Sequence, residues 1–175
     1  RAGVCLENER DGLVHDYTRR GGDEDAFIIA PEGAEWAQVR SALWNAAEAA
    51  EKRKDAKVAR EYELGLPAEL DAGQRRDLVR AFAENIRDRY GVAVDAAIHA
   101  PHDYGDDRNH HAHVTTTPRE AGPEGLGAKT RQLDVRSTAS VEVEAIRERW
   151  AVMVYDALAH AQVAERVYHR SYERQ

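Results

Sequence analysis

The sequence from Val92 to Thr117 reads VAVDAAIHAPHDYGDDRNHHAHVTTT, and polar and small apolar residues alternate at both of its ends. Such a period of two is typical of β-strands that bury one face, so we expect strands over 92–100 and 111–117. The link between them is short, which favours an antiparallel hairpin over a parallel crossover. On one face of this hairpin the alternation gathers polar residues, namely Asp95, His99, His111, His113 and Thr115.

Outward from this hairpin, the spacing of apolar residues predicts the remaining elements. Strands are expected over 27–29 and 58–66, helices over 35–50, 71–90 and 141–163, and a glycine-rich loop over 120–128. Asp71 is suited to cap the second helix and Gly91 to end it. Helices and strands therefore interleave, and we predict an α+β fold with an antiparallel sheet, helices packed on one face and the histidines on the other.

Composition limits the class of protein. The chain has 175 residues, one cysteine (Cys5) and a formal net charge of -7. This length suits one domain, the single thiol excludes a disulfide framework and favours a reducing compartment, and no apolar run approaches the roughly 20 residues that span a membrane. The acidic balance argues mildly against nucleic acid, but basic residues cluster at 19–20, 52–54, 75–76 and 129–136. These clusters are either solvated helix faces or parts of a basic groove.

The histidines suggest a metal site. In a strand, His111 and His113 point the same way, so both imidazoles can reach one metal ion. His99 has the matching parity for a third ligand, while His102 lies in the loop between the two strands. Three neutral imidazoles leave coordination positions open, as catalysis requires. Surface histidines that chelate nothing, and exposed carboxylates at Glu61 and Glu63 that are merely solvated, are the alternative.

Several stretches resemble the MobA/MobL plasmid relaxases, members of the HUH endonucleases, including TraA-like relaxase domains. They are DYTRRGG near the start, EWAQVRSALWNAAEAAEKRKDAKVAREYELGLPAEL, AIHAPHDYGDDRNHHAHVTTT and the closing HRSYERQ. The resemblance covers essentially the whole chain. It implies that residues 1–175 form a single relaxase (nuclease) domain.

The resemblance also assigns residues. It implies that His99, His111 and His113 are metal ligands and that His102 is not. Glu63 in the first place, and Glu61 after it, match acidic positions that support the metal site.

The family's nucleophile is a tyrosine just before the sequence RAG, and this chain begins with Arg1-Ala2-Gly3. The resemblance therefore implies that the nucleophile immediately precedes Arg1, and that the first strand of the sheet precedes it. Both would lie outside the chain, which then holds the metal site without the nucleophile.

The implied activity is site- and strand-specific nicking of single-stranded origin-of-transfer DNA by tyrosine transesterification, with Mn²⁺ or Mg²⁺, or alternatively Zn²⁺. Arg19, Arg20, Lys129 and Arg131 are candidates for phosphate contacts. Expected partners are the DNA and other relaxosome and coupling proteins, in the bacterial cytoplasm and without a membrane. Two other readings stay open: a non-catalytic DNA-binding module, and a metal-dependent phosphodiesterase that uses water.

Overall fold

The computed structural model describes residues 2–16, 22–53, 55–101 and 106–162. Its centre is an antiparallel sheet with the strand order β3-β5-β6-β4. A fifth strand, β7, pairs with β6 outside this order. These strands are β3 (Asp23–Ile29), β4 (Arg60–Gly65), β5 (Val92–His99), β6 (His111–Gly122) and β7 (Gly125–Lys129). The predicted α+β class with an antiparallel sheet is confirmed, and so is the hairpin of β5 and β6.

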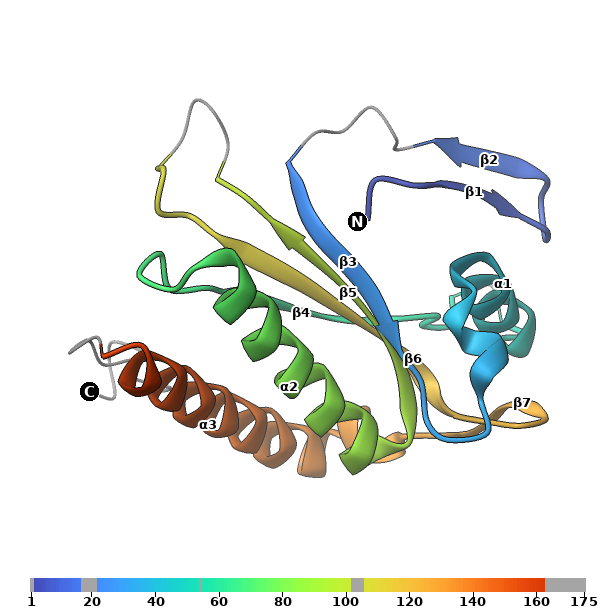
Figure 1. The fold of residues 1–175 in the computed structure, drawn as a ribbon. Helices are drawn as coiled ribbons and strands as arrows, with labels where there is room; N and C mark the ends of the chain where they lie inside the picture. Colours follow the sequence, from blue (N-terminus) through green and yellow to red (C-terminus); the bar gives the residue numbers. More distant parts are fainter. Residues whose placement is uncertain (1, 17–21, 54, 102–105, 163–175) are drawn as a thin grey trace.

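Two long helices cover one face of the sheet. They are α2 (Ala72–Tyr90) and α3 (Arg136–His160), which lie together beneath the strands in Figure 1. The helix α2 begins as predicted, because Asp71 and Gln74 form a reciprocal capping box. It ends at Gly91, whose φ of 64° suits glycine.

The main core lies between these helices and the sheet. Alternate residues of β5 and β6 enter it, including Val94, Ala96, Ile98, Ala112 and Val114, together with Phe82 and Ile86 of α2. The opposite parity, which carries Asp95, His99, His111 and His113, therefore faces away from α2 and α3. The register confirms the period-two assignment, since His99 pairs with His111 and Asp95 with Thr115.

The remaining helical segment departs from the expectation that all helices pack on one face. It consists of a 3-10 turn, η1 (Glu35–Gln38), followed by α1 (Arg40–Ala50). Arg40 and Trp44 of α1 hydrogen-bond to Asp95, which lies on the histidine parity of β5. The helix α1 thus covers part of the histidine face, because a buried carboxylate on that face gives its polar groups partners.

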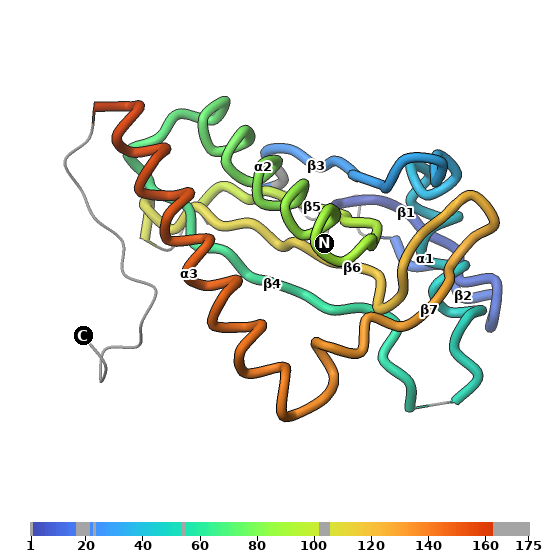
Figure 2. The backbone as a smooth tube through the Cα atoms, turned by 90° about the horizontal axis from the view of Figure 1, so that it is seen from below, coloured from blue at the N-terminus to red at the C-terminus, as the bar shows by residue number. Residues whose placement is uncertain are grey.

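Other differences from the predicted elements lie at the two sides of the sheet. Residues near the start form a separate two-stranded sheet of β1 (Cys5–Asn8) and β2 (Leu13–Asp16), joined by a turn that contains Asp11 and Gly12. The predicted loop over 120–128 is instead the hairpin of β6 and β7. Neither is visible as a periodic pattern, since these strands are short and rich in glycine or charge. Figure 2 shows β7 beside α1, seen from below.

The helix α3 also begins earlier than predicted, at Arg136, after a short 3-10 turn η2 (Arg131–Leu133). Its connection to α2 is polar as well as apolar. The carboxylate of Glu142 accepts hydrogen bonds from the Tyr90 hydroxyl at 2.6 Å and from Arg89 at 2.8 Å. In the part of the chain that the structure describes, no helix combines the length and the apolar character needed to cross a membrane.

Candidate functional site on the histidine face

Three imidazoles gather where β5 ends and β6 begins. His99 and His111 are direct cross-strand partners, and His113 follows two residues along β6 on the same face. Their ring centroids form a nearly equilateral triangle, with separations of 5.3 Å for His99–His111, 5.3 Å for His99–His113 and 5.4 Å for His111–His113. The strand pairing thus brings together the histidines that the sequence singled out.

Acceptors lie on the Nδ1 side of two of these rings. Nδ1 of His111 is 3.1 Å from the carbonyl oxygen of Asn109, and Nδ1 of His113 is 3.0 Å from Oε1 of Glu61. A carbonyl can only accept, so Nδ1 of His111 is the donor and its Nε2 carries the lone pair. Carboxylates and carbonyls behind the second ring nitrogen are the partners that orient metal-bound histidines.

The side chains do not form a finished metal site as they stand. Among the described residues, no group of three or more His, Cys, Asp and Glu side chains is arranged so that it could hold a metal ion. The rings of His99 and His111 are stacked, with an angle of 24° between their planes. The donor set is nevertheless chemically suited to a divalent ion such as Zn²⁺ or Mn²⁺, so the three-histidine site stays a prediction.

The two candidate acids occupy different positions. Both are exposed residues of β4; Glu63 lies opposite His113 in the register and Glu61 lies opposite Thr115. The carboxylate that reaches His113 is nevertheless that of Glu61, across the diagonal between the strands. The sequence ranked Glu63 above Glu61, and the structure places Glu61 in contact.

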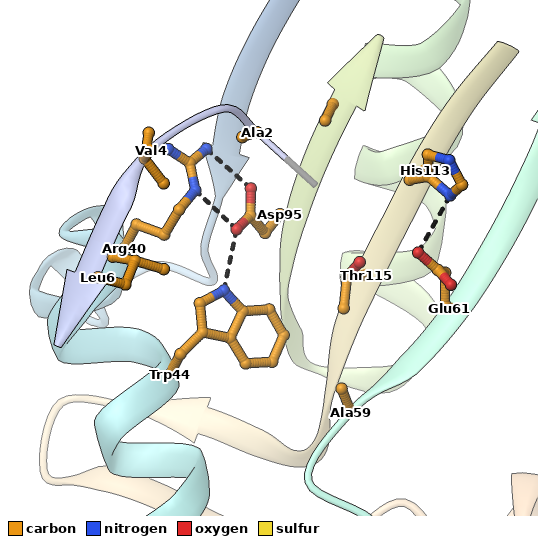
Figure 3. Close-up of a pocket in the computed structure, with 11 residues that line it drawn as sticks. Ala2, Val4, Leu6, Arg40, Trp44, Ala59, Glu61, Asp95, His113 and Thr115 are labelled. Atoms are coloured by element: carbon orange, nitrogen blue, oxygen red, sulfur yellow. Dashed lines mark hydrogen bonds and ion pairs between the residues drawn. The ribbon is translucent and has the colours of Figure 1, made fainter. Parts of the chain in front are cut away.

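A pocket of about 350 Å³ opens beside His113. Figure 3 shows its walls: the N-terminal segment and β1 on one side, α1 on another, and β5, β6 and β4 below. Its lining is largely apolar, with polar groups at the sheet; it comprises Ala2, Val4, Leu6, Arg40, Trp44, Ala59, Glu61, Asp95, Ala97, His113 and Thr115. The pocket connects the second residue of the chain with the histidine cluster.

The buried carboxylate of Asp95 lines this pocket and has three hydrogen-bond donors. It accepts two hydrogen bonds from Arg40, each 2.8 Å long, and one of 2.9 Å from the indole of Trp44. Only 10% of the Asp95 side chain and 19% of the Arg40 side chain are exposed. A bidentate pair of this kind is directional, so it fixes α1 against the sheet. Sequence reasoning placed Asp95 on this face but gave it no role; an acid inside an otherwise apolar strand was the available signal.

A row of three polar side chains, His110, Glu24 and Arg75, lies beside the histidine cluster. Nδ1 of His110 is 3.9 Å from Glu24, and Glu24 in turn pairs at 3.0 Å with the buried Arg75 of α2. Burial lowers the pKa of His110, and the positive charge of Arg75 lowers it further, while Glu24 acts in the opposite direction. This histidine is therefore neutral over a wider pH range than an exposed one.

Two of the four candidate phosphate-binding residues, Lys129 and Arg131, lie in the described part of the chain. Arg19, Arg20 and also His102 lie outside the described residues. Lys129 donates to the buried carboxylate of Glu51 at 2.7 Å, and Arg131 is exposed in η2. Lys129 pairs in register with Arg119, eight residues along β6 from His111, or roughly 26 Å at strand spacing. A structural role thus suits Lys129, and its phosphate contact is not part of the function proposed below.

Comparison with known proteins gives a consistent set of relatives. The model of the MobA/MobL family matches residues 1–175. The mobilization protein MobL of Acidithiobacillus ferridurans is 38% identical over 198 aligned positions, which cover 98% of this chain and 52% of that protein. The conjugal transfer protein TraA of Rhizobium radiobacter is 34% identical, over 71% of this chain and 12% of that protein.

A solved structure supports the same grouping. It comes from work on the molecular basis of vancomycin resistance transfer in Staphylococcus aureus, and it superposes with a TM-score of 0.82 at 25% identity. The match covers 98% of this chain and 87% of that chain. The chain spans about half the length of the MobL relative and about an eighth of TraA, with 52% and 12% covered.

Proposed function

The chain belongs to the MobA/MobL family, and on this premise we propose that it is the metal-binding core of a plasmid mobilisation relaxase. In this function it binds single-stranded origin-of-transfer DNA and supports site-specific nicking by tyrosine transesterification. The observation that carries the proposal is the triangle of His99, His111 and His113 beside a pocket on one face of the sheet.

The donor set supports the choice of a divalent metal. Imidazole nitrogens bind such ions at about 2.0–2.1 Å, so rings that share one ion have centroids about 5 Å apart. The observed separations of 5.3–5.4 Å are close to this value. Convergence would then need rotations of the rings rather than movement of strands. We propose Mn²⁺ or Mg²⁺ as the ion, with Zn²⁺ as the other choice for a three-histidine set.

The roles of the residues follow from their contacts. A bound divalent ion would offset negative charge on a phosphodiester held beside it. His99, His111 and His113 would hold the ion through Nε2. Glu61 and the carbonyl of Asn109 would orient two of these rings and keep their Nδ1 protons in place. The pocket beside His113 would exclude water from one side of the phosphate.

The proposed nucleophile is the tyrosine expected immediately before Arg1. Ala2 is buried and lines the same pocket as His113. A residue two positions before Ala2 would therefore start close to the histidine face, which supports this assignment. Attack by tyrosine would form a phosphotyrosine bond and release the 3'-hydroxyl of the other DNA segment, with the proton of the phenol passing to solvent or base.

The proposal is tested by titrating the chain with Mn²⁺ in a calorimeter, beside His99→Ala and His160→Ala. We expect one-to-one binding in the unchanged chain, its loss in His99→Ala and its retention in His160→Ala. His160 is a suitable control because it is exposed at the end of α3. Equal binding by all three proteins would contradict the metal site and the function built on it.

The two other readings predict different products. A phosphodiesterase that uses water would cleave DNA without a covalent protein–DNA adduct, and a non-catalytic module would bind oligonucleotides equally well after loss of the three histidines. Denaturing gels of labelled DNA and affinity measurements on the triple histidine variant separate these cases from the relaxase.

A further inference from the structure

The N-terminal hairpin is poorly supported by its own contacts. β1 and β2 form a sheet of two strands, separate from the main sheet. All four residues of β2 are exposed, including Leu13 at 57% and Val14 at 61%. A two-stranded hairpin alone is marginally stable in water, so the position of this one depends on what it contacts elsewhere.

Among the described residues, the side-chain amide of Asn45 in α1 contacts the hairpin through two hydrogen bonds. Its Oδ1 accepts from the backbone N–H of Glu9 at 3.1 Å, and its Nδ2 donates to the carbonyl of Glu7 at 3.1 Å. One amide thus satisfies a backbone carbonyl of β1 and the backbone N–H of the residue that follows β1. A nearby ion pair of Arg10 with Glu48, 3.3 Å long and exposed, adds little.

The helix that carries Asn45 is itself held at both ends. Near its start, Arg40 pairs with the buried Asp95 of β5. At its end, the buried Glu51 accepts from Arg119 at 2.9 Å and from Lys129 at 2.7 Å. The helix α1 is therefore a rigid connection between the main sheet and the hairpin.

The hairpin in turn forms one wall of the pocket. Val4 and Leu6 line it together with His113, on the side opposite β4. A displaced hairpin would open the pocket to solvent without moving His99, His111 or His113, because these three histidines belong to β5 and β6.

We propose that Asn45 is a positioning residue: it sets the N-terminal hairpin against the histidine face so that the pocket can receive single-stranded DNA. The DNA part of this inference rests on the proposed function. The side chains that line the pocket do not include Asn45, which acts through β1.

The test compares Asn45→Ala with Ser41→Ala, which changes an exposed polar residue of the same helix. Amide hydrogen exchange of residues 5–16 should be about tenfold faster in Asn45→Ala, the change expected from losing two ordinary hydrogen bonds. In Asn45→Ala, the amide hydrogen exchange of residues 92–99 should match that of the unchanged chain. The unfolding midpoint and the affinity for Mn²⁺ should be unchanged as well. Affinity for a short fluorescent single-stranded DNA of mixed sequence should fall about tenfold, because fewer molecules have the hairpin in place. Ser41→Ala should change none of these.

Unchanged exchange in residues 5–16 would overturn the role of Asn45 in holding the hairpin. Faster exchange with unchanged DNA affinity would overturn its role in positioning a substrate. If the unchanged chain binds neither Mn²⁺ nor DNA, the proposed function fails, and the DNA part of this inference fails with it. That result is distinguishable, because it needs no variant and leaves the exchange data to decide the hairpin contact.

Discussion

His113 is the most buried of the three clustered histidines, and its surroundings also influence the orientation of its ring. Its side chain is 8% exposed, and Glu61 approaches its Nδ1 from the neighbouring strand. A carboxylate in this place orients the ring and makes its other nitrogen a better ligand. Glu61 is thus the acid whose loss should be felt at the site.

Glu61→Gln should lower the Mn²⁺ affinity of the chain about 10–100-fold, the usual effect of losing an orienting carboxylate. The measurement is calorimetric titration at neutral pH, with Glu63→Gln as the matched control from the same strand. Glu63 lies opposite His113 in the register, but the carboxylate that contacts His113 is that of Glu61, so the change at Glu63 should leave the affinity within experimental error. The reverse ranking would restore Glu63 as the supporting acid.

At the scale of elements, the turn from α2 to β5 places the central strand. Gly91 has a φ of 64°, and its N–H bonds to the carbonyl of Arg87 at 2.7 Å. A Cβ added there would meet only Glu120, with the nearest atom at 3.5 Å, so space is sufficient and the backbone angle decides the cost.

Gly91→Ala should therefore destabilise the fold by about 1–2 kcal/mol, the cost of a left-handed conformation for a residue with a Cβ. Urea unfolding followed by circular dichroism measures this change. Gly127→Ala is the control, since its φ is not positive and its nearest neighbour is at 3.9 Å. Equal stability of Gly91→Ala and the unchanged chain would contradict the argument from φ.

The contact of α1 with the sheet is a second feature of this scale. Asp95 and Arg40 form a bidentate pair that is mostly buried, and Arg53 and Asp55 form one with side chains 80% and 71% exposed. The chain thus contains the same chemical pair in two environments.

Asp95→Asn should cost about 3 kcal/mol, because it leaves the charge of Arg40 buried without its counter-ion. Asp55→Asn should cost between about 0 and 1 kcal/mol, because water solvates an exposed pair. Both values come from denaturant unfolding of the same chain. A similar cost for the two substitutions would show that burial does not govern the pair.

At the scale of the whole molecule, the sheet has one closed face and one partly open face. α2 and α3 close the first, while α1 and the N-terminal hairpin leave the histidine end of the second accessible through the pocket. Several basic side chains from the clusters that could form a basic groove are instead in ion pairs within the chain. Among them, Arg75 pairs with Glu24 and Lys129 pairs with Glu51.

These internal pairs make stability depend on pH. Burial raises the pKa of Glu51, but the hydrogen bonds from Lys129 and Arg119 outweigh it, and the net pKa is lowered. A lowered pKa in the folded state stabilises the fold above the unfolded pKa of about 4.3, and this contribution is lost as the pH falls through the folded value.

Glu51→Gln should cost about 1–3 kcal/mol at neutral pH, since Arg119 and Lys129 lose the carboxylate charge and one of its two acceptor oxygens. Its stability should also decline less steeply than that of the unchanged chain as the pH falls below about 4.3. Thermal unfolding across this range measures both effects, and Glu124→Gln, at an exposed position in the turn between β6 and β7, is the control. Parallel pH profiles for Glu51→Gln and the unchanged chain would refute the assignment.

The features that could be predicted from the sequence are those that follow from the regular repeat of side chains along one strand or helix. The alternation around His111 and His113 placed both on one face, Asp71 and Gly91 marked the ends of α2, and the short link predicted the hairpin of β5 and β6. These patterns are readable because one strand or helix exposes its faces with a fixed repeat, whatever it later contacts.

Contacts between segments that are far apart in the sequence became known from the tertiary structure alone. Glu61 rather than Glu63 reaches His113 because the diagonal between paired strands depends on register and side-chain direction. The helix α1 lies on the histidine face because Asp95 offers a buried acceptor there, and Asn45 contacts β1 because that helix is so placed. Such contacts join residues more than thirty positions apart, and no local period encodes them.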